Sequence, residues 1–271
     1  MTAARTPERG DSASSARRPR VLVVAGHDPS GAGVEADRAA LADLALDVAS
    51  VVTACTDQDA HGVRSIGARE PSVWLAEARA CLAGVDALKF GLLPGPDHVE
   101  AACDLVRAAR AESPRVVVVV DPVLAASSGG RFLDGRGVDA LRTRLFALDV
   151  IATPNVPELA ELARADAREL ASSIERRVAA GRTLLASGLL AVVMKGGHGD
   201  EDPVHDVWIT RDDETPVHRL HPRIVGGKVR GSGCRFASRL AGELASGRTL
   251  DHAVRAAAEH VTSAIERAAR R

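Results

Sequence analysis

The chain lacks tyrosine altogether, and aromatic residues make up only 2% of its 271 residues. Proteins that bind nucleic acid by stacking bases depend on aromatic side chains, so this class is disfavoured. The formal net charge is −1, so no overall positive field is available to attract nucleic acid or a membrane surface. No apolar run approaches the roughly 18 residues that a transmembrane helix requires. We therefore expect a cytoplasmic protein with neither a nucleic-acid partner nor a membrane partner.

Cysteine is scarce as well, and the four cysteines are far apart in the sequence: Cys55, Cys81, Cys103 and Cys234. The absence of a C-x-x-C pair favours reduced thiols over disulfides or a zinc site. Residues 1–19 contain no apolar segment of the kind that a secretory signal has, and their Ser, Ala and Arg content predicts a disordered tail. Residues 20–271 contain no strong linker and are expected to form one domain.

Apolar runs of strand length alternate with segments of helical periodicity. The five valines at 116–120 are typical of a parallel strand covered on both faces. The alternation predicts an α/β protein with a mostly parallel sheet and helices on both faces. Strands are expected at 21–25, 48–54, up to 91, 116–120, 150–153 and 190–194, with a hairpin over 204–221; helices are expected at 34–46, 71–83, 97–111, 137–146, 157–163, 168–187, 233–246 and 250–268.

Polar or glycine-rich segments follow the predicted strands. In parallel sheets ligands bind at the carboxyl ends of the strands, so these segments are expected to meet at one edge. The segments are 26–33, 56–59, 89–91, 121–123, 153–158, 195–198 and 231–234.

The tetrad Gly231-Ser232-Gly233-Cys234 stands at the start of a predicted helix. Free backbone N–H groups and the positive end of the helix dipole make such a junction an anion site, and a phosphoryl group is a natural guest. Cys234 falls in the first turn, where the thiolate is favoured. Taken alone, the tetrad is equally compatible with a plain helix start and a buried apolar cysteine.

Seven segments in order, over residues 20–268, resemble the hydroxymethylpyrimidine/phosphomethylpyrimidine kinases of thiamine biosynthesis, a branch of the ribokinase-like superfamily. They read GHDPSGAGVEAD, VVTACTDQDAHGV, KFG, DPVLAASSG, TPNVPELAEL, VMKGGH and GSGC. The resemblance implies a ribokinase-like three-layer α/β/α fold and ATP-dependent phosphorylation of 4-amino-5-hydroxymethyl-2-methylpyrimidine, its monophosphate or both. It also implies a requirement for Mg²⁺ and a homodimer.

The same resemblance implies roles for individual residues. Cys234 would accept the substrate hydroxyl proton, and the N–H groups of Gly231, Ser232, Gly233 and Cys234 would hold the phosphoryl oxygens. The pyrimidine would be read by Gln58, with Gly26, Asp28, Ala32 and Asp37 nearby and Leu92 and Val123 as apolar walls. ATP would be bound by Lys195, Asn155, Thr153, Gly197 and Arg235, and Mg²⁺ by Glu158 and Asp121.

Simpler interpretations of several of these residues stay open. Gln58 also fits a solvated loop, and Asp37 fits an ordinary place in the first turns of its helix. Asn155 and Glu158 fit helix caps. Lys195 and Asp121 fit an ion pair. His27, His61 and His198 lack the spacing of a metal site.

The chain departs from the family pattern near the expected phosphates. Ser127 replaces a frequent lysine, Arg230 precedes the tetrad in place of histidine, and Arg235 follows it in place of threonine. The first loop is one glycine shorter at 30–33, and Asp57 and Asp59 add acid beside Gln58. Either the two arginines compensate for the lost lysine charge, or the site has drifted.

Three functions therefore compete. We favour an active pyrimidine kinase. The first alternative is a kinase for pyridoxal or another vitamin precursor, which would not need the amide of Gln58. The second is a homologue that binds a pyrimidine or nucleotide but transfers phosphate poorly, in which Cys234 would be dispensable.

Overall fold

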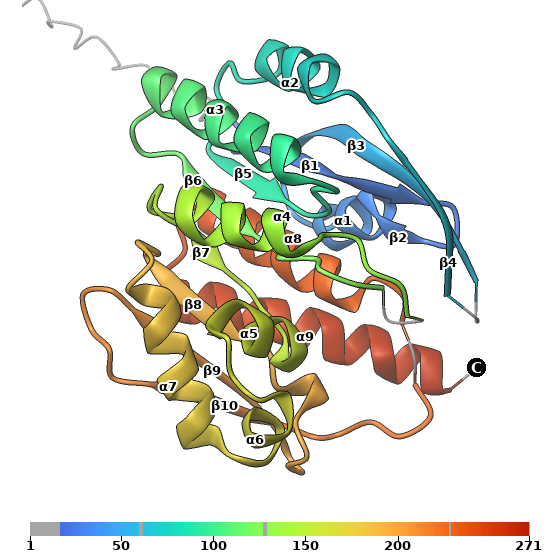
Figure 1. Ribbon diagram of the computed structural model, residues 1–271, viewed down its shortest axis with the longest axis vertical. Coiled ribbons are helices and arrows are strands. Elements are labelled where there is room, and N and C mark those ends of the chain that lie inside the picture. The colour runs from blue at the N-terminus through green and yellow to red at the C-terminus, as the bar shows by residue number, and fades with distance from the viewer. Residues whose placement is uncertain (1–16, 60–61, 127–128, 228, 271) are drawn as a thin grey trace, which may run out of the picture.

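The computed structural model describes residues 17–59, 62–126, 129–227 and 229–270. It contains a ten-stranded sheet with the order β10-β9-β8-β7-β6-β5-β1-β3-β4, and β2 pairs with the end of β1 (Figure 1). The strands are β1 (Arg20–Asp28), β2 (Ala32–Gly33), β3 (Asp47–Asp59), β4 (Gly62–Ala68), β5 (Ala87–Phe90), β6 (Val117–Val120), β7 (Ile151–Ala152), β8 (Ala191–Met194), β9 (Val204–Thr210) and β10 (Val217–His221).

The central strands β3, β1, β5, β6, β7 and β8 run parallel, whereas β4, β9 and β10 pair antiparallel at the two edges. The helices are α1 (Val34–Leu41), α2 (Pro71–Ala80), α3 (Pro96–Glu112), α4 (Gly135–Ala140), α5 (Val156–Ala163), α6 (Ala167–Ser172), α7 (Ile174–Leu185), α8 (Ser232–Ala245) and α9 (Leu250–Ala269), with short turns η1 (Leu141–Leu145) and η2 (Gly196–His198). The fold class predicted from the sequence is confirmed.

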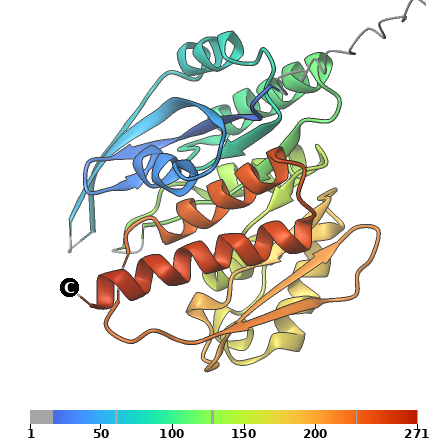
Figure 2. The ribbon, with the colours of Figure 1, turned by 180° about the vertical axis from the view of Figure 1, so that it is seen from behind.

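Two layers of helices cover the two faces of the sheet. Leu22 and Val24 of β1 pack into a core with α2, α3, α4, α5 and α7, which lie in front in Figure 1. Val21 and Val23 point to the other face and pack against α1, α8 and α9, seen in Figure 2. Successive side chains of a strand face opposite ways, so a strand that is covered on both faces must be apolar throughout.

Two expected helices have different bounds. The helix expected at 34–46 ends at Leu41, where a turn from Leu44 N–H to the Leu41 carbonyl leads into β3. The helix expected at 168–187 is two helices, because Ser173 is extended and caps α7 by accepting from Arg176 N–H.

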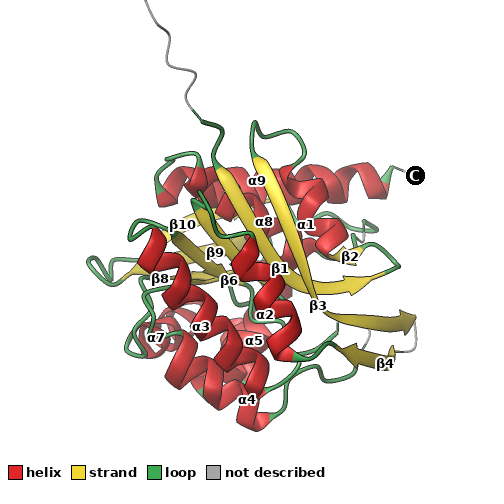
Figure 3. Cartoon of the chain, turned by 90° about the horizontal axis from the view of Figure 1, so that it is seen from above, coloured by secondary structure: helices red, strands yellow, loops and turns green. Residues whose placement is uncertain are grey.

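The largest difference concerns residues 56–68. The sequence predicts a strand ending at residue 54 and a polar loop after it, but β3 continues to Asp59 and pairs antiparallel with β4. Gln58 therefore lies on a strand rather than in a loop. Figure 3 shows this hairpin at the edge of the molecule.

The ends of the described chain add two facts. Of the expected tail, residues 1–16 lie outside the described residues, but Arg17 donates to the Gly84 carbonyl and to Asp86. Within the described residues, we find no helix whose length and apolar character would let it cross a bilayer.

Candidate active site

The carboxyl ends of the parallel strands meet the N-terminus of α8. Gly231 has a positive φ of 68°, and a side chain there would place its Cβ 2.8 Å from Ala36 Cβ and 3.1 Å from Ala32 Cα. The turn into α8 is therefore held tightly against the segment after β1. The first N–H groups of a helix have no partner within the helix, so the tetrad offers donors at this edge.

Gly233 faces a lysine and a carboxylate. A Cβ on Gly233 would lie 3.1 Å from Lys195 Nζ and 3.4 Å from Asp121 Oδ2. Lys195 Nζ donates to Asp121 Oδ1 at 2.8 Å, and Thr153 Oγ1 donates to the same oxygen at 3.3 Å. The structure thus brings together residues from α8, β6, β7 and β8 that the sequence assigned to catalysis, ATP and metal.

Glu158 belongs to the same group of charges. Burial raises its pKa to about 7, with Asp121 adding to the rise and Lys195 opposing it. Burial lowers the pKa of Lys195, but the carboxylates of Asp121 and Glu158 outweigh that effect and the net shift is upward. A buried carboxylate and a half-buried one beside an ammonium group and a helix N-terminus fit a Mg²⁺–phosphate pair, because Mg²⁺ prefers oxygen ligands.

Asn155 and Glu158 also cap α5. Asn155 Oδ1 accepts from Glu158 N–H at 2.9 Å, and Glu158 Oε2 accepts from Asn155 N–H at 2.8 Å. The structural interpretation of these two residues is therefore correct, and it fixes Glu158 close to Lys195. A metal role for Glu158 stays a prediction.

A buried ion pair lies behind the tetrad. Lys89 Nζ donates to Asp37 Oδ1 at 2.7 Å, and both side chains are fully buried. Ser238 of α8 donates to the same oxygen at 2.8 Å, whereas Asp37 Oδ2 is buried without a hydrogen-bond partner in the described structure. Asp37 is thus a core residue facing the site rather than an ordinary polar residue on its helix.

Lys89 and Ser238 had no role in the sequence interpretation. A signal existed for Lys89, since it is the charged residue of the wholly buried strand ALKF, and such a residue is almost never buried without a partner. Ser238 offered no comparable signal. Its hydroxyl reaches Asp37 across 201 positions of sequence.

The protonation state of Cys234 differs from expectation. Burial raises the pKa of its thiol to about 12; Asp37 and Asp121 add to the rise, while Lys89 opposes it. Burial outweighs the opposing charge of Lys89, so the thiolate expected from the helix N-terminus and Arg235 is not favoured in the structure. Arg235 instead lies close enough to His260 of α9 to help lower the pKa of that histidine.

A small apolar cluster lies apart from the two main cores. Leu92 packs with Ala54 and Phe132, and Val123 lies against this cluster. Gly26 is adjacent, since a Cβ there would lie 2.8 Å from Leu92 Cδ2. Thr53 Oγ1 donates to the Leu92 carbonyl at 2.6 Å and fixes this segment. Gly26, Leu92 and Val123 are thus brought together, as the resemblance implies.

Asp28 connects the other residues that are expected to bind the pyrimidine. Its Oδ2 accepts from Gln58 Nε2 at 2.6 Å and from Arg230 at 2.9 Å, and its Oδ1 accepts from Ser30. Gln58 is therefore not a solvated loop residue. Arg230, a candidate replacement for the missing phosphate-binding charge, is instead bonded to Asp28.

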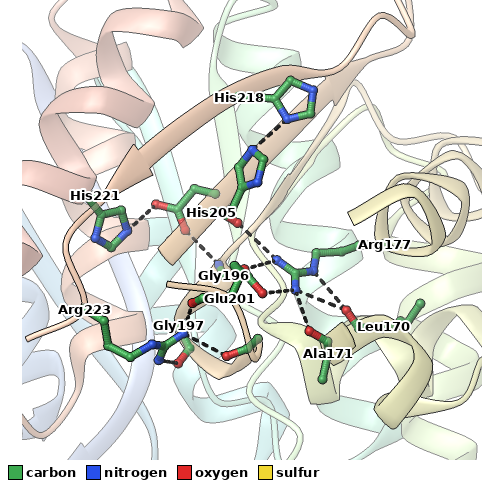
Figure 4. Close-up of polar contacts among 12 residues, drawn as sticks. Leu170, Ala171, Arg177, Gly196, Gly197, Glu201, His205, His218, His221 and Arg223 are labelled. Carbon is green, nitrogen blue, oxygen red and sulfur yellow. Dashed lines mark hydrogen bonds and ion pairs between the residues drawn. The ribbon is translucent and has the colours of Figure 1, made fainter. Parts of the chain in front are cut away.

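The segment after β8 is held in place by a second hydrogen-bond network, shown in Figure 4. Fully buried Arg177 donates to Glu201 and to the carbonyls of Leu170, Ala171 and His205. Arg223 donates to the carbonyls of Gly197, Gly199 and Glu201. Exposed Gly197 is thereby fixed next to Lys195, but its contact with ATP stays a prediction.

Three expected positions give no further information. Ser127 and His61 lie outside the described residues, as does the side chain of Asp59. Asp57 is exposed and pairs in the β3–β4 hairpin.

Comparisons with known proteins show the family and the fold. A family model described as phosphomethylpyrimidine kinase matches residues 28–271. A relative from Escherichia coli (strain K12), named hydroxymethylpyrimidine/phosphomethylpyrimidine kinase, is 36% identical over 83% of this chain and 82% of its own length. The ADP complex of pyridoxal kinase from Staphylococcus aureus has a TM-score of 0.80 at 26% identity, covering 92% of this chain and 88% of that one. A phosphomethylpyrimidine kinase from Clostridium difficile 630 has a TM-score of 0.74 at 25% identity, covering 92% and 100%.

Proposed function

The chain belongs to the phosphomethylpyrimidine kinase family, and from that premise we propose that it uses ATP to phosphorylate 4-amino-5-hydroxymethyl-2-methylpyrimidine, its monophosphate or both in thiamine biosynthesis. One observation carries the proposal. The N-terminus of α8 faces Lys195 and Asp121 closely: a Cβ on Gly233 would lie 3.1 Å from Lys195 Nζ and 3.4 Å from Asp121 Oδ2. Phosphoryl transfer needs this combination of N–H donors, a cation and metal-binding oxygens more than it needs covalent chemistry.

On the phosphate side, the N–H groups of Ser232, Gly233 and Cys234 bind the oxygens of the transferring group. Lys195 neutralises phosphate charge. Asp121 and Glu158 would hold Mg²⁺, which, when bound, supplies further positive charge to the phosphates. The capping of α5 keeps Glu158 in place for this role.

On the acceptor side, the Leu92 cluster packs against one face of the ring and Gln58 binds its polar edge. Cys234, in the first turn of α8, is the candidate acceptor of the hydroxyl proton. A thiol with a pKa of about 12 is protonated at neutral pH, so this role has to be tested directly.

A second acceptor, pyridoxal, is favoured by one observation. The S. aureus pyridoxal kinase complex superposes on this chain with a TM-score of 0.80. The fold is shared with a pyridoxal kinase, and the choice of acceptor depends on the side chains that contact the ring.

The test is ATP-dependent phosphorylation with Mg²⁺, followed by mass spectrometry, with the hydroxymethylpyrimidine and pyridoxal in parallel reactions. Formation of the pyrimidine mono- or diphosphate, with at least a hundredfold loss in Cys234→Ala as expected for a lost general base, is the predicted result (about 10²–10⁴ for proton transfer). Cys234→Ser, which keeps the size of the side chain, controls for packing. Binding without turnover of either acceptor would replace the proposal with a ligand-binding homologue.

Two further properties are proposed from the resemblance. We propose a cytoplasmic location, and a homodimer whose mass in sedimentation would be twice the 28.3 kDa of one chain. A species at the mass of one chain across working concentrations would contradict the dimer.

A further inference from the structure

We propose that Arg230 is a positioning residue for the acceptor: by holding Asp28, it fixes the amide of Gln58 so that only the carbonyl oxygen is offered to the ligand. The proposal rests on the proposed function, because it concerns how the acceptor ring is chosen. It assigns to Arg230 a role in acceptor selectivity rather than in binding phosphate.

Arg230 joins two parts of the site that are distant in sequence. It directly precedes the tetrad, and its guanidinium donates to Asp28 Oδ2 at 2.9 Å across 202 positions. The Arg230 side chain is 41% exposed, whereas that of Asp28 is only 4% exposed. The arginine therefore covers a carboxylate that would otherwise be buried with less compensation.

Asp28 is held as an acceptor on both oxygens. Oδ1 accepts from Ser30 N–H at 2.9 Å and from Ser30 Oγ at 2.7 Å, while Oδ2 accepts from Gln58 and Arg230. Burial raises the pKa of Asp28, but the donors from Ser30 and Arg230 outweigh it, so the carboxyl group is ionised at neutral pH. An ionised carboxylate only accepts hydrogen bonds.

This chemistry settles which way the Gln58 amide faces. The group 2.6 Å from Asp28 Oδ2 must be the amide nitrogen, because its oxygen could not donate. The second N–H points to Thr56 Oγ1 at 3.2 Å. Both amide hydrogens are used by the protein, and the carbonyl oxygen remains for the ligand. Gln58 thus accepts from an exocyclic amine and does not donate to a ring nitrogen.

The loss of Arg230 should act on the acceptor selectively. Without it, Asp28 Oδ2 keeps one side-chain donor, so the carboxylate is held less firmly and the Gln58 amide can turn over. A substrate that presents an N–H to the Gln58 oxygen then loses this hydrogen bond. A substrate that presents only hydrogen-bond acceptors at this position loses nothing, because the fixed Gln58 oxygen already repelled it in the native site.

The experiment compares wild type with Arg230→Met and Arg230→Lys, and uses Arg144→Met, which removes an exposed pair with Glu100, as the matched control. Calorimetry measures binding of 4-amino-5-hydroxymethyl-2-methylpyrimidine without ATP, and kinetics give KM for each substrate. We expect Arg230→Met to weaken pyrimidine binding about tenfold, as for loss of a charge-assisted hydrogen bond. The preference for the pyrimidine over pyridoxal should fall by a similar factor, and Arg230→Lys should restore part of both.

Other outcomes overturn the proposal in distinguishable ways. A rise in KM for ATP with unchanged pyrimidine binding would make Arg230 a phosphate-binding residue. Equal losses for both acceptors would make it merely structural. In an Asp28→Ala background, Arg230→Met should cost nothing further; an additional full loss would show that it does not act through Asp28. If wild type binds no aminopyrimidine at all, the proposed function fails together with this inference, whereas normal wild-type turnover with an unaffected Arg230→Met overturns this inference alone.

Discussion

Lys89 is the buried cation on which the centre of the candidate site depends. It is fully buried and bonded to Asp37, and its positive charge opposes the high pKa of Cys234. Lys89→Met leaves the Asp37 carboxylate buried without its counter-charge, so we expect a loss of about 3–5 kcal/mol in the free energy of unfolding. Urea denaturation of wild type and variant measures this difference in the free energy of unfolding.

Two further variants make the Lys89 result specific. Arg107→Met removes an exposed pair with Asp104 and should cost no more than about 1 kcal/mol. Adding Asp37→Asn to Lys89→Met should recover much of the stability, because the buried Asp37 carboxylate without a counter-charge is then absent. A double variant as unstable as Lys89→Met would show that the loss comes from packing instead.

His98 gives a pH dependence whose sign is fixed by burial. Burial lowers its pKa, while a histidine in an unfolded chain titrates near about 6.5. The unfolded state therefore binds the proton first, and the free energy of unfolding falls as the pH drops through 6.5 toward the lower folded pKa. His98→Gln should flatten this dependence in urea titrations between pH 5 and 7. An unchanged slope would assign it to His198, His205 and His260, whose pKa values are also lowered.

Single residues were predictable where they follow a strand and not where they meet across the fold. Lys195 and Asp121 follow buried strands, so their meeting at the sheet edge could be expected. The partner of Arg230 could not, since an arginine beside a glycine-rich tetrad suggests phosphate equally well. The protonation state of Cys234 could not be predicted for a related reason: a local motif does not show how deeply a side chain is buried.

At the scale of elements, the β3–β4 hairpin was missed because its sequence resembles a loop. Residues 62–68 contain only two large apolar side chains, Val63 and Ile66, and no regular alternation. Thr56 to Asp59 are all polar, so they do not resemble a strand interior. The parallel strands were predictable because cover on both faces requires continuous apolar runs.

Arg177 carries the element-scale prediction. Its guanidinium ties α6 and α7 to β9 and to the segment after β8 (Figure 4). Arg177→Leu removes these donors and leaves Glu201 without its partner, so we expect a loss of about 3–5 kcal/mol in the free energy of unfolding. Its neighbour Arg176, in an exposed pair with Glu169, is the matched control, and Arg176→Leu should cost no more than about 1 kcal/mol. Similar losses in the two variants would mean that the buried network adds nothing.

At the scale of the whole molecule, the candidate site exists only when the sheet is assembled. Its residues come from the ends of β1, β3, β5, β6, β7 and β8 and from the start of α8. A ligand that binds them binds the native state alone and stabilises the whole chain. The order of strands and polar segments in the sequence was enough to predict this common edge, whereas the distances across it depend on packing.

Gly233→Ala tests where the nucleotide binds by this linkage. ADP with Mg²⁺ at about 100 times its dissociation constant should stabilise wild type by about 2.7 kcal/mol, seen as a rise in Tm. The added methyl group would lie 3.1 Å from Lys195 Nζ, a flexible tip that can move, so the variant should fold but lose most of the nucleotide-dependent rise. Gly135→Ala, whose Cβ would meet nothing within 4 Å, should keep it. An undiminished rise in Gly233→Ala would place the nucleotide away from the N-terminus of α8, and with it the phosphate side of the proposed reaction.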